Sequence, residues 1–119
     1  MQFFVSDPVG WQGGKVLFES LLAAKYKHAK TLRMCRTNCE DEGVRAICNY
    51  VIINENVVML DLLSNKISPL GCEFLSKLMA PEAKRGILHL KLDHNSIGSM
   101  GIQKLAVGLC RNKVLQNLS

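Results

Sequence analysis

The sequence predicts an α/β fold in which short parallel strands line one face and helices line the other. Three observations predict it. A pattern starts at residues 29, 57, 87 and 115, so its spacings are 28, 30 and 28 residues. Its copies open with alternating apolar and polar residues and continue to apolar residues four apart. Recurrence at such a period is typical of a protein built from stacked, similar units.

The copies divide the chain into one domain of about four units, at 1–28, 29–56, 57–86 and 87–114, with the start of a fifth at 115–119. A single strand-loop-helix unit cannot bury its apolar face alone, so the units must stack. The first and last expected strands are apolar and lack a polar capping unit. We therefore expect a piece of a longer repeat protein, an end-to-end homo-oligomer, or a subunit of a larger assembly.

A short strand opens each copy. Apolar residues occupy the fourth and sixth positions, so they point to one side of the strand while the residues between them point to the other. These pairs are Phe3 with Val5, Leu32 with Met34, Leu60 with Leu62, and Leu90 with Leu92. The paired apolar residues are the expected strand side of the core.

A turn and a helix follow each strand. Asn65 and Asn95 stand at the ninth position, where an amide side chain can bond to turning backbone. Ser68 before Pro69 is typical of a helix start. The segment 10–14 is rich in glycine and predicts a turn. Apolar residues four apart then mark the inner face of each helix, and a glycine before them allows close packing. These glycines are Gly14, Gly43, Gly71 and Gly101.

With this repeat length and a glycine before each helix, the sequence resembles the leucine-rich-repeat family, in its ribonuclease-inhibitor-like subtype. The resemblance covers Phe3 to Leu118. It implies a solenoid shaped as a short arc, with parallel strands on the concave face and α-helices on the convex face. Thr37 and Pro8 depart from the family pattern by replacing the asparagine, and Gly10 replaces an apolar residue.

Composition excludes several classes of protein. Hydrophobic residues make up 48% and charged residues 21%, so the chain is expected to fold around a core. No apolar run approaches the roughly 18 residues of a membrane span, and we expect no membrane partner. Five cysteines without framework spacing predict reduced thiols and a cytoplasmic location, with nuclear or cytoskeletal and ciliary locations left open.

Strand side chains that the core does not use are expected on the concave face. They mix apolar groups with both charges, as a surface for a protein partner does. Arg33 is the expected anchor, because arginine is enriched in binding hot spots. A solvated face without a partner is the alternative. The predicted protein-binding residues are Phe4, Lys30, Arg33, Arg36, Met59, Asp61, Leu63, His89, Lys91 and Asp93.

Catalytic motifs are not found in the sequence. It contains no glycine-rich phosphate loop and no nucleophile elbow. The cysteines are scattered, whereas structural zinc needs four converging ligands. We therefore expect no enzymatic activity, no catalytic residue, no cofactor and no metal.

A non-enzymatic protein-interaction module or scaffold is the expected function. The alternative is a regulator of a small GTPase, because Ran GTPase-activating proteins resemble this repeat type. The net charge of +5 also raises nucleic acid as a partner. Nucleic acid is nevertheless unlikely on charge balance, since the expected concave face carries only +1. The charges counted are Lys30, Arg33, Arg36 and Lys91 against Asp7, Asp61 and Asp93.

Overall fold

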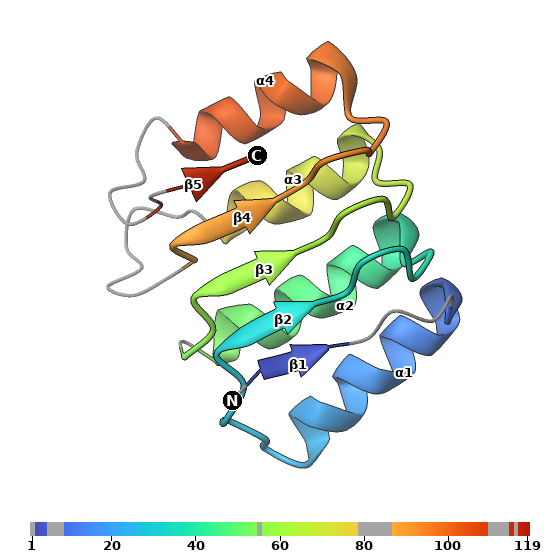
Figure 1. Ribbon diagram of the computed structural model, residues 1–119, viewed down its shortest axis with the longest axis vertical. Helices are drawn as coiled ribbons and strands as arrows, with labels where there is room; N and C mark the ends of the chain where they lie inside the picture. Colours follow the sequence, from blue (N-terminus) through green and yellow to red (C-terminus); the bar gives the residue numbers. More distant parts are fainter. Residues whose placement is uncertain (1, 5–8, 55, 79–86, 110–114, 116) are drawn as a thin grey trace.

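The computed structural model describes residues 2–4, 9–54, 56–78, 87–109, 115 and 117–119. Strands and helices alternate along this chain (Figure 1). The strands are β1 (Gln2–Phe4), β2 (Thr31–Arg33), β3 (Met59–Asp61), β4 (His89–Lys91) and β5 (Asn117–Leu118). The helices are α1 (Gly10–Ala23), α2 (Glu40–Ile53), α3 (Pro69–Lys77) and α4 (Gly98–Leu109). The predicted α/β class with parallel strands is confirmed.

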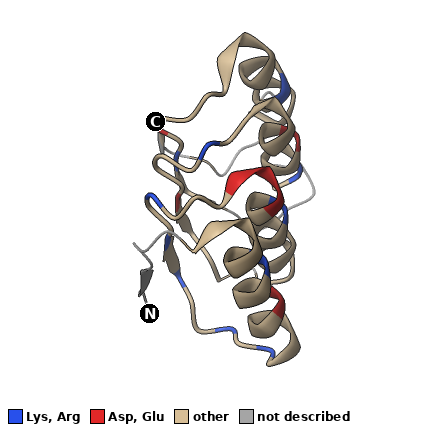
Figure 2. Ribbon diagram, turned by 90° about the vertical axis from the view of Figure 1, so that its right-hand side faces the viewer, with Lys and Arg blue, Asp and Glu red and all other residues tan. Residues whose placement is uncertain are grey.

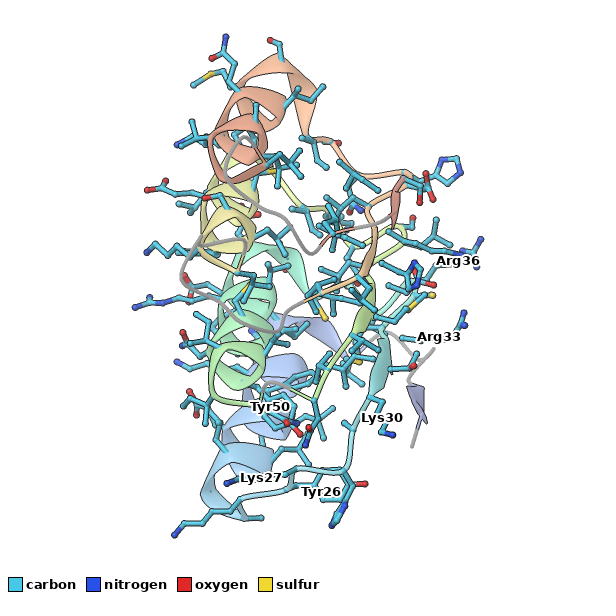
Figure 3. All side chains as sticks on the ribbon, turned by 90° about the vertical axis from the view of Figure 1, so that its left-hand side faces the viewer. Tyr26, Lys27, Lys30, Arg33, Arg36 and Tyr50 are labelled. Atoms are coloured by element: carbon cyan, nitrogen blue, oxygen red, sulfur yellow. The ribbon has the colours of Figure 1, made fainter. Side chains whose placement is uncertain are left out.

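The strands form one parallel sheet in the order β1-β2-β3-β4-β5, with the helices layered on one of its sides (Figures 2 and 3). In the register, Leu32 pairs with Leu60 and Leu60 with Leu90. Backbone pairing continues past the three-residue strands, because Val58 N–H donates to Lys30 O and Arg36 N–H donates to Leu63 O, each at 2.9 Å. The segment 30–36 is therefore fixed against the segment 58–63.

The core lies between the sheet and the helices. Leu32, Leu60 and Leu90 reach it from the sheet, as the alternation in the sequence predicts. Phe18 and Leu75 reach it from the helices and are fully buried. Aliphatic burial on this scale is the main force that holds the two layers together. Met79, which the sequence assigns to the same core, lies outside the described residues.

Two asparagines fix the backbone where strands turn into helices. Asn95 Oδ1 accepts hydrogen bonds from the N–H groups of Asn65 and Ile67, at 2.7 and 3.1 Å. Asn65 Oδ1 accepts in the same way from the N–H groups of Thr37 and Cys39, at 3.0 and 3.2 Å. The side-chain amide of Asn95 also donates to Leu62 O, and that of Asn65 donates to Met34 O. Each asparagine therefore bonds to a carbonyl that follows the strand of the preceding unit. The role expected from the ninth position is confirmed.

The starts of α2 and α3 are joined by Asp41. Its carboxylate accepts hydrogen bonds from both the N–H and the hydroxyl of Ser68. Ser68 caps α3 as predicted, since its Oγ accepts from Leu70 N–H at 3.3 Å. A Cβ on Gly71 would lie 2.5 Å from Asp41 Oδ1 and 2.6 Å from Ile67 Cγ2. Glycine is required there because the two helix starts approach this closely.

The turn predicted over 10–14 is wrong, because α1 begins at Gly10. Only Gly10 has a turn-like backbone, with φ of +73°, and its N–H donates to Thr37 O at 2.9 Å. Gly14 lies inside the helix and is buried, where an added Cβ would be 3.4 Å from Cys39 Sγ. Packing against Cys39 thus outweighs the low helix propensity of glycine. Trp11, in the first turn, is half-buried.

Candidate protein-binding face

The sheet surface opposite the helices carries the predicted site, and we call it the strand face. Its central row consists of Arg33, Asp61 and Lys91, which are direct register partners on β2, β3 and β4. Phe4 of β1 is the register partner of Arg33, but its side chain lies outside the described residues. Arg33, Asp61 and Lys91, all among the predicted binding residues, are therefore neighbours across the sheet.

Arg33 and Asp61 form an ion pair, with 3.8 Å between Arg33 Nη1 and Asp61 Oδ2. The Arg33 side chain is 36% exposed, whereas Asp61 is only 5% exposed. Arg33 Nε is buried and has no hydrogen-bond acceptor among the described residues. Part of the Arg33 side chain thus reaches solvent, while its Nε–H donor is buried and unused.

Asp61 bonds to the backbone in addition to its ion pair with Arg33. Its Oδ1 accepts a hydrogen bond from Leu63 N–H at 3.2 Å, at the point where β3 ends. Met59, on the same strand, is 9% exposed, and all three residues of β3 are buried. The expectation that Met59 and Asp61 lie open to a partner is wrong. A central strand is flanked on both sides, here by the rows of β2 and β4, which cover it.

The other predicted residues differ in exposure. Lys30, Arg36, Lys91 and Asp93 are exposed, while Leu63 and His89 are half-buried. Lys30, Arg33 and Arg36 extend from the sheet on the side away from the helices (Figure 3). Arg36 has a left-handed backbone with φ of 55°, at the turn after β2. The accessible part of the strand face is thus mainly cationic along β2.

Cys35 lies within this group and was not among the predicted site residues. Burial raises the pKa of its thiol, and a hydrogen bond to Asp61 and the charge of that carboxylate raise it further. The nearby charges of Arg33 and Arg36 lower the pKa, but by less. The thiol is therefore protonated at neutral pH and is a poor nucleophile. The alternation of strand residues predicts Cys35 on this face, although it is not one of the predicted binding residues.

A cavity of about 380 Å³ opens between the carboxyl ends of α1 and α2, and the sequence gives no sign of it. Tyr50 and Asn54 form its polar base. The Tyr50 hydroxyl donates to Tyr26 O at 2.7 Å, and Asn54 Nδ2 donates to the Tyr50 hydroxyl at 2.9 Å. Leu21, Leu22 and Ile53 supply apolar walls. These bonds tie the loop after α1 to the end of α2.

Metal ligands do not gather in the described part of the chain, where no three His, Cys, Asp or Glu residues lie together. Its four cysteines, Cys35, Cys39, Cys48 and Cys72, are free thiols. None of the helices described could span a membrane.

Comparison with protein-family models gives no match for the chain. Curated protein sequences give no match either.

Proposed function

We propose that this chain is a non-enzymatic protein-interaction module of the leucine-rich-repeat type, which binds its partner on the strand face. The observation that carries the proposal is the row of Arg33, Asp61 and Lys91. A buried carboxylate there positions one arginine, and exposed cations stand on both of the neighbouring strands. Arginine held in a partly buried setting is typical of a binding hot spot.

The repeat type is supported by the two asparagines. Asn65 and Asn95 stand 30 residues apart and bond to backbone groups in equivalent places of successive units. The strands follow one another in sequence order across the sheet, each joined to the next through a helix. Stacked strand-helix units that arc into a solenoid account for both features.

A docking role for the strand face agrees with where the apolar groups lie. The helices cover one side of the sheet (Figure 3). Leu63, just after β3, is half-buried, and its carbonyl accepts a hydrogen bond from the N–H of the exposed Arg36. Apolar groups within a charged surround are typical of protein interfaces. The proposal includes a cytoplasmic location, because the odd number of cysteines follows no disulfide framework.

Capture of partners from native extract tests the proposal. Arg33→Gln combined with Lys91→Gln removes two exposed cations of the strand face and should abolish capture of the specific partner. Lys15→Gln with Lys77→Gln removes two exposed cations from the helices and should leave capture unchanged. Asp61 is a poor choice for substitution, because it supports β3. Equal capture by the two double variants would exclude the strand face as the docking surface.

A further inference from the structure

Cations are concentrated in one segment of the chain, the connection from α1 into β2. Five of the 15 Lys and Arg residues stand within residues 25–36, and no Asp or Glu occurs between Glu19 and Glu40. Figure 2 shows this segment as a run of blue along the loop and the strand. The five are Lys25, Lys27, Lys30, Arg33 and Arg36, and we call the last three, which lie on β2 or beside it, the β2 cations.

Hydrogen bonds to the neighbouring segment fix the backbone that carries the β2 cations. Lys30 O accepts from Val58 N–H, Met34 N–H donates to Asp61 O, and Arg36 N–H donates to Leu63 O, each at 2.9 Å. Lys30, Arg33 and Arg36 follow at intervals of three residues along this paired segment and point away from the helices (Figure 3). At about 3.3 Å per residue a fully extended segment of this length would span about 20 Å, and the turn at Arg36 makes the actual span shorter.

Described acidic groups on the strand face leave most of this charge uncompensated. Asp61 is buried and already bonded to Leu63 N–H and paired with Arg33. Asp93 is exposed, but it follows β4, two strands away from β2. The net charge of the whole face, as counted from the sequence, is only +1, because that count adds acidic residues of other strands to the cations beside β2. The structure instead separates a cationic strip along β2 from the acidic residue beside β4.

An extended acidic protein segment fits this strip better than a nucleic acid does. The cations are spaced along one backbone segment, where the carboxylates of an extended peptide can pair with them, and the Arg33 side chain is 36% exposed. Binding of single-stranded nucleic acid relies on aromatic side chains that stack on bases. The described strand face has no Phe, Tyr or Trp from β2 to β4. Phe4 of β1, the register partner of Arg33, and Tyr26, before β2, are the aromatic residues next to this segment, and the DNA probe below tests them.

We infer that the strand face binds an acidic protein segment, rich in Asp or Glu and extended along β2, with its carboxylates paired to Lys30, Arg33 and Arg36. Lys25 and Lys27 are not part of this contact, because both line the cavity at the carboxyl ends of α1 and α2, and Lys27 extends toward the helices (Figure 3). The inference rests on the proposed function and adds the chemistry of the partner. It also places the ion pairs of that acidic segment on the residues of β2 and its flanks.

Fluorescence anisotropy with defined probes tests the inference. The first probe is a labelled peptide of alternating Glu and Ser, long enough to span residues 30–36. The second replaces each Glu with Gln, and the third is a single-stranded DNA oligonucleotide of equal length. The full chain should bind the Glu peptide, bind the Gln peptide at least about tenfold more weakly, and prefer the Glu peptide to DNA at physiological salt.

Two triple variants locate the binding. Lys30→Gln, Arg33→Gln and Arg36→Gln together should weaken binding of the Glu peptide by about tenfold or more, since each exposed ion pair contributes modestly. Lys15→Gln, Arg45→Gln and Lys77→Gln remove the same charge from helices α1, α2 and α3 and should change it less than about twofold. Urea unfolding establishes that both variants fold.

Three results would overturn the inference: tighter binding to DNA, equal binding of the Glu and Gln peptides, or equal losses in the two triple variants. The last would mean attraction by net charge alone. Failure of the inference and failure of the proposed function are distinguishable. If the Glu peptide does not bind while Arg33→Gln with Lys91→Gln still abolishes capture, the module binds through its strand face but its partner is not acidic.

Discussion

Asn65 Oδ1 accepts two hydrogen bonds from Thr37, one from the backbone N–H at 3.0 Å and one from the hydroxyl at 2.8 Å. Thr37 occupies the ninth position of its own unit, where the two later units have asparagine. The Thr37 hydroxyl has one proton and also lies 3.1 Å from Met34 O, so Asn65 Oδ1 and Met34 O are alternative acceptors for it. A buried threonine thus serves the turn of one unit and is bonded by the asparagine of the next.

Asn65→Ala should be strongly destabilising, because it removes the partner of buried N–H groups on Thr37 and Cys39. The expected loss is about 3 kcal/mol of the free energy of unfolding, measured by urea titration. Asn49→Ala, at an exposed position of α2, serves as the control and should change stability by less than about 0.5 kcal/mol. Similar losses for the two variants would contradict the role of Asn65.

Gly71→Ala should destabilise the chain although alanine is the better helix former. A Cβ would lie 2.5 Å from Asp41 Oδ1, so the contact between the starts of α2 and α3 must open. We expect a net loss of about 2 kcal/mol, since overpacking exceeds the gain of about 1 kcal/mol in helix propensity. Gln103→Ala, on the exposed side of α4, is the control. A gain in thermal stability for Gly71→Ala would disprove the close approach.

Stability should fall as the pH rises above about 9, through the buried thiols. Burial raises the pKa of Cys72 to about 11, with the charge of Asp41 adding to the shift and Lys104 opposing it. The unfolded chain therefore loses this proton first, at its ordinary pKa of 9.0, and the stabilisation is lost between pH 9 and pH 11.

Cys72→Ala tests this pH dependence. The variant is less stable at neutral pH because it loses a buried side chain, but its free energy of unfolding should fall less steeply between pH 9 and pH 11. Cys39 and Cys48 retain their raised pKa values, so part of the slope remains. Urea titrations at several pH values give the slopes, and identical slopes would refute the assignment to Cys72.

Tyr50→Phe should loosen the loop after α1. The variant leaves Tyr26 O and Asn54 Nδ2 without the hydroxyl that joins them at 2.7 and 2.9 Å. We expect a loss of about 1–2 kcal/mol in the free energy of unfolding, with faster amide exchange in residues 24–28. Unchanged exchange there would show that the loop is held by other contacts.

The layout of the fold is readable from the sequence because the alternation, the asparagines and the glycines each have a local physical cause. Leu32, Leu60 and Leu90 pair in the sheet as their positions indicate. The start of α1 could not be predicted in this way. Gly14 lies inside α1, where it packs against Cys39. Because these two residues are far apart in the sequence, a local sequence pattern cannot reveal their contact.

The candidate site is less completely readable. Residue type predicts the charges of Arg33, Asp61 and Lys91, but the burial of Asp61 depends on the neighbouring strands. A sum of charges over all strands also hides the strip along β2, because that sum ignores which groups are buried. The same limit applies to Met59, whose apolar side chain is covered rather than offered to a partner.

Chemical labelling of lysines tests the docking role of the strand face most directly. Lys30 and Lys91 lie on that face, whereas Lys15 and Lys77 lie on α1 and α3, and all four are exposed. Mass spectrometry then compares their reactivity in the free chain and in complex with the captured partner. Protection of Lys30 and Lys91 with unchanged labelling of Lys15 and Lys77 is the expected result. Protection of Lys15 and Lys77, with Lys30 and Lys91 still reactive, would contradict it.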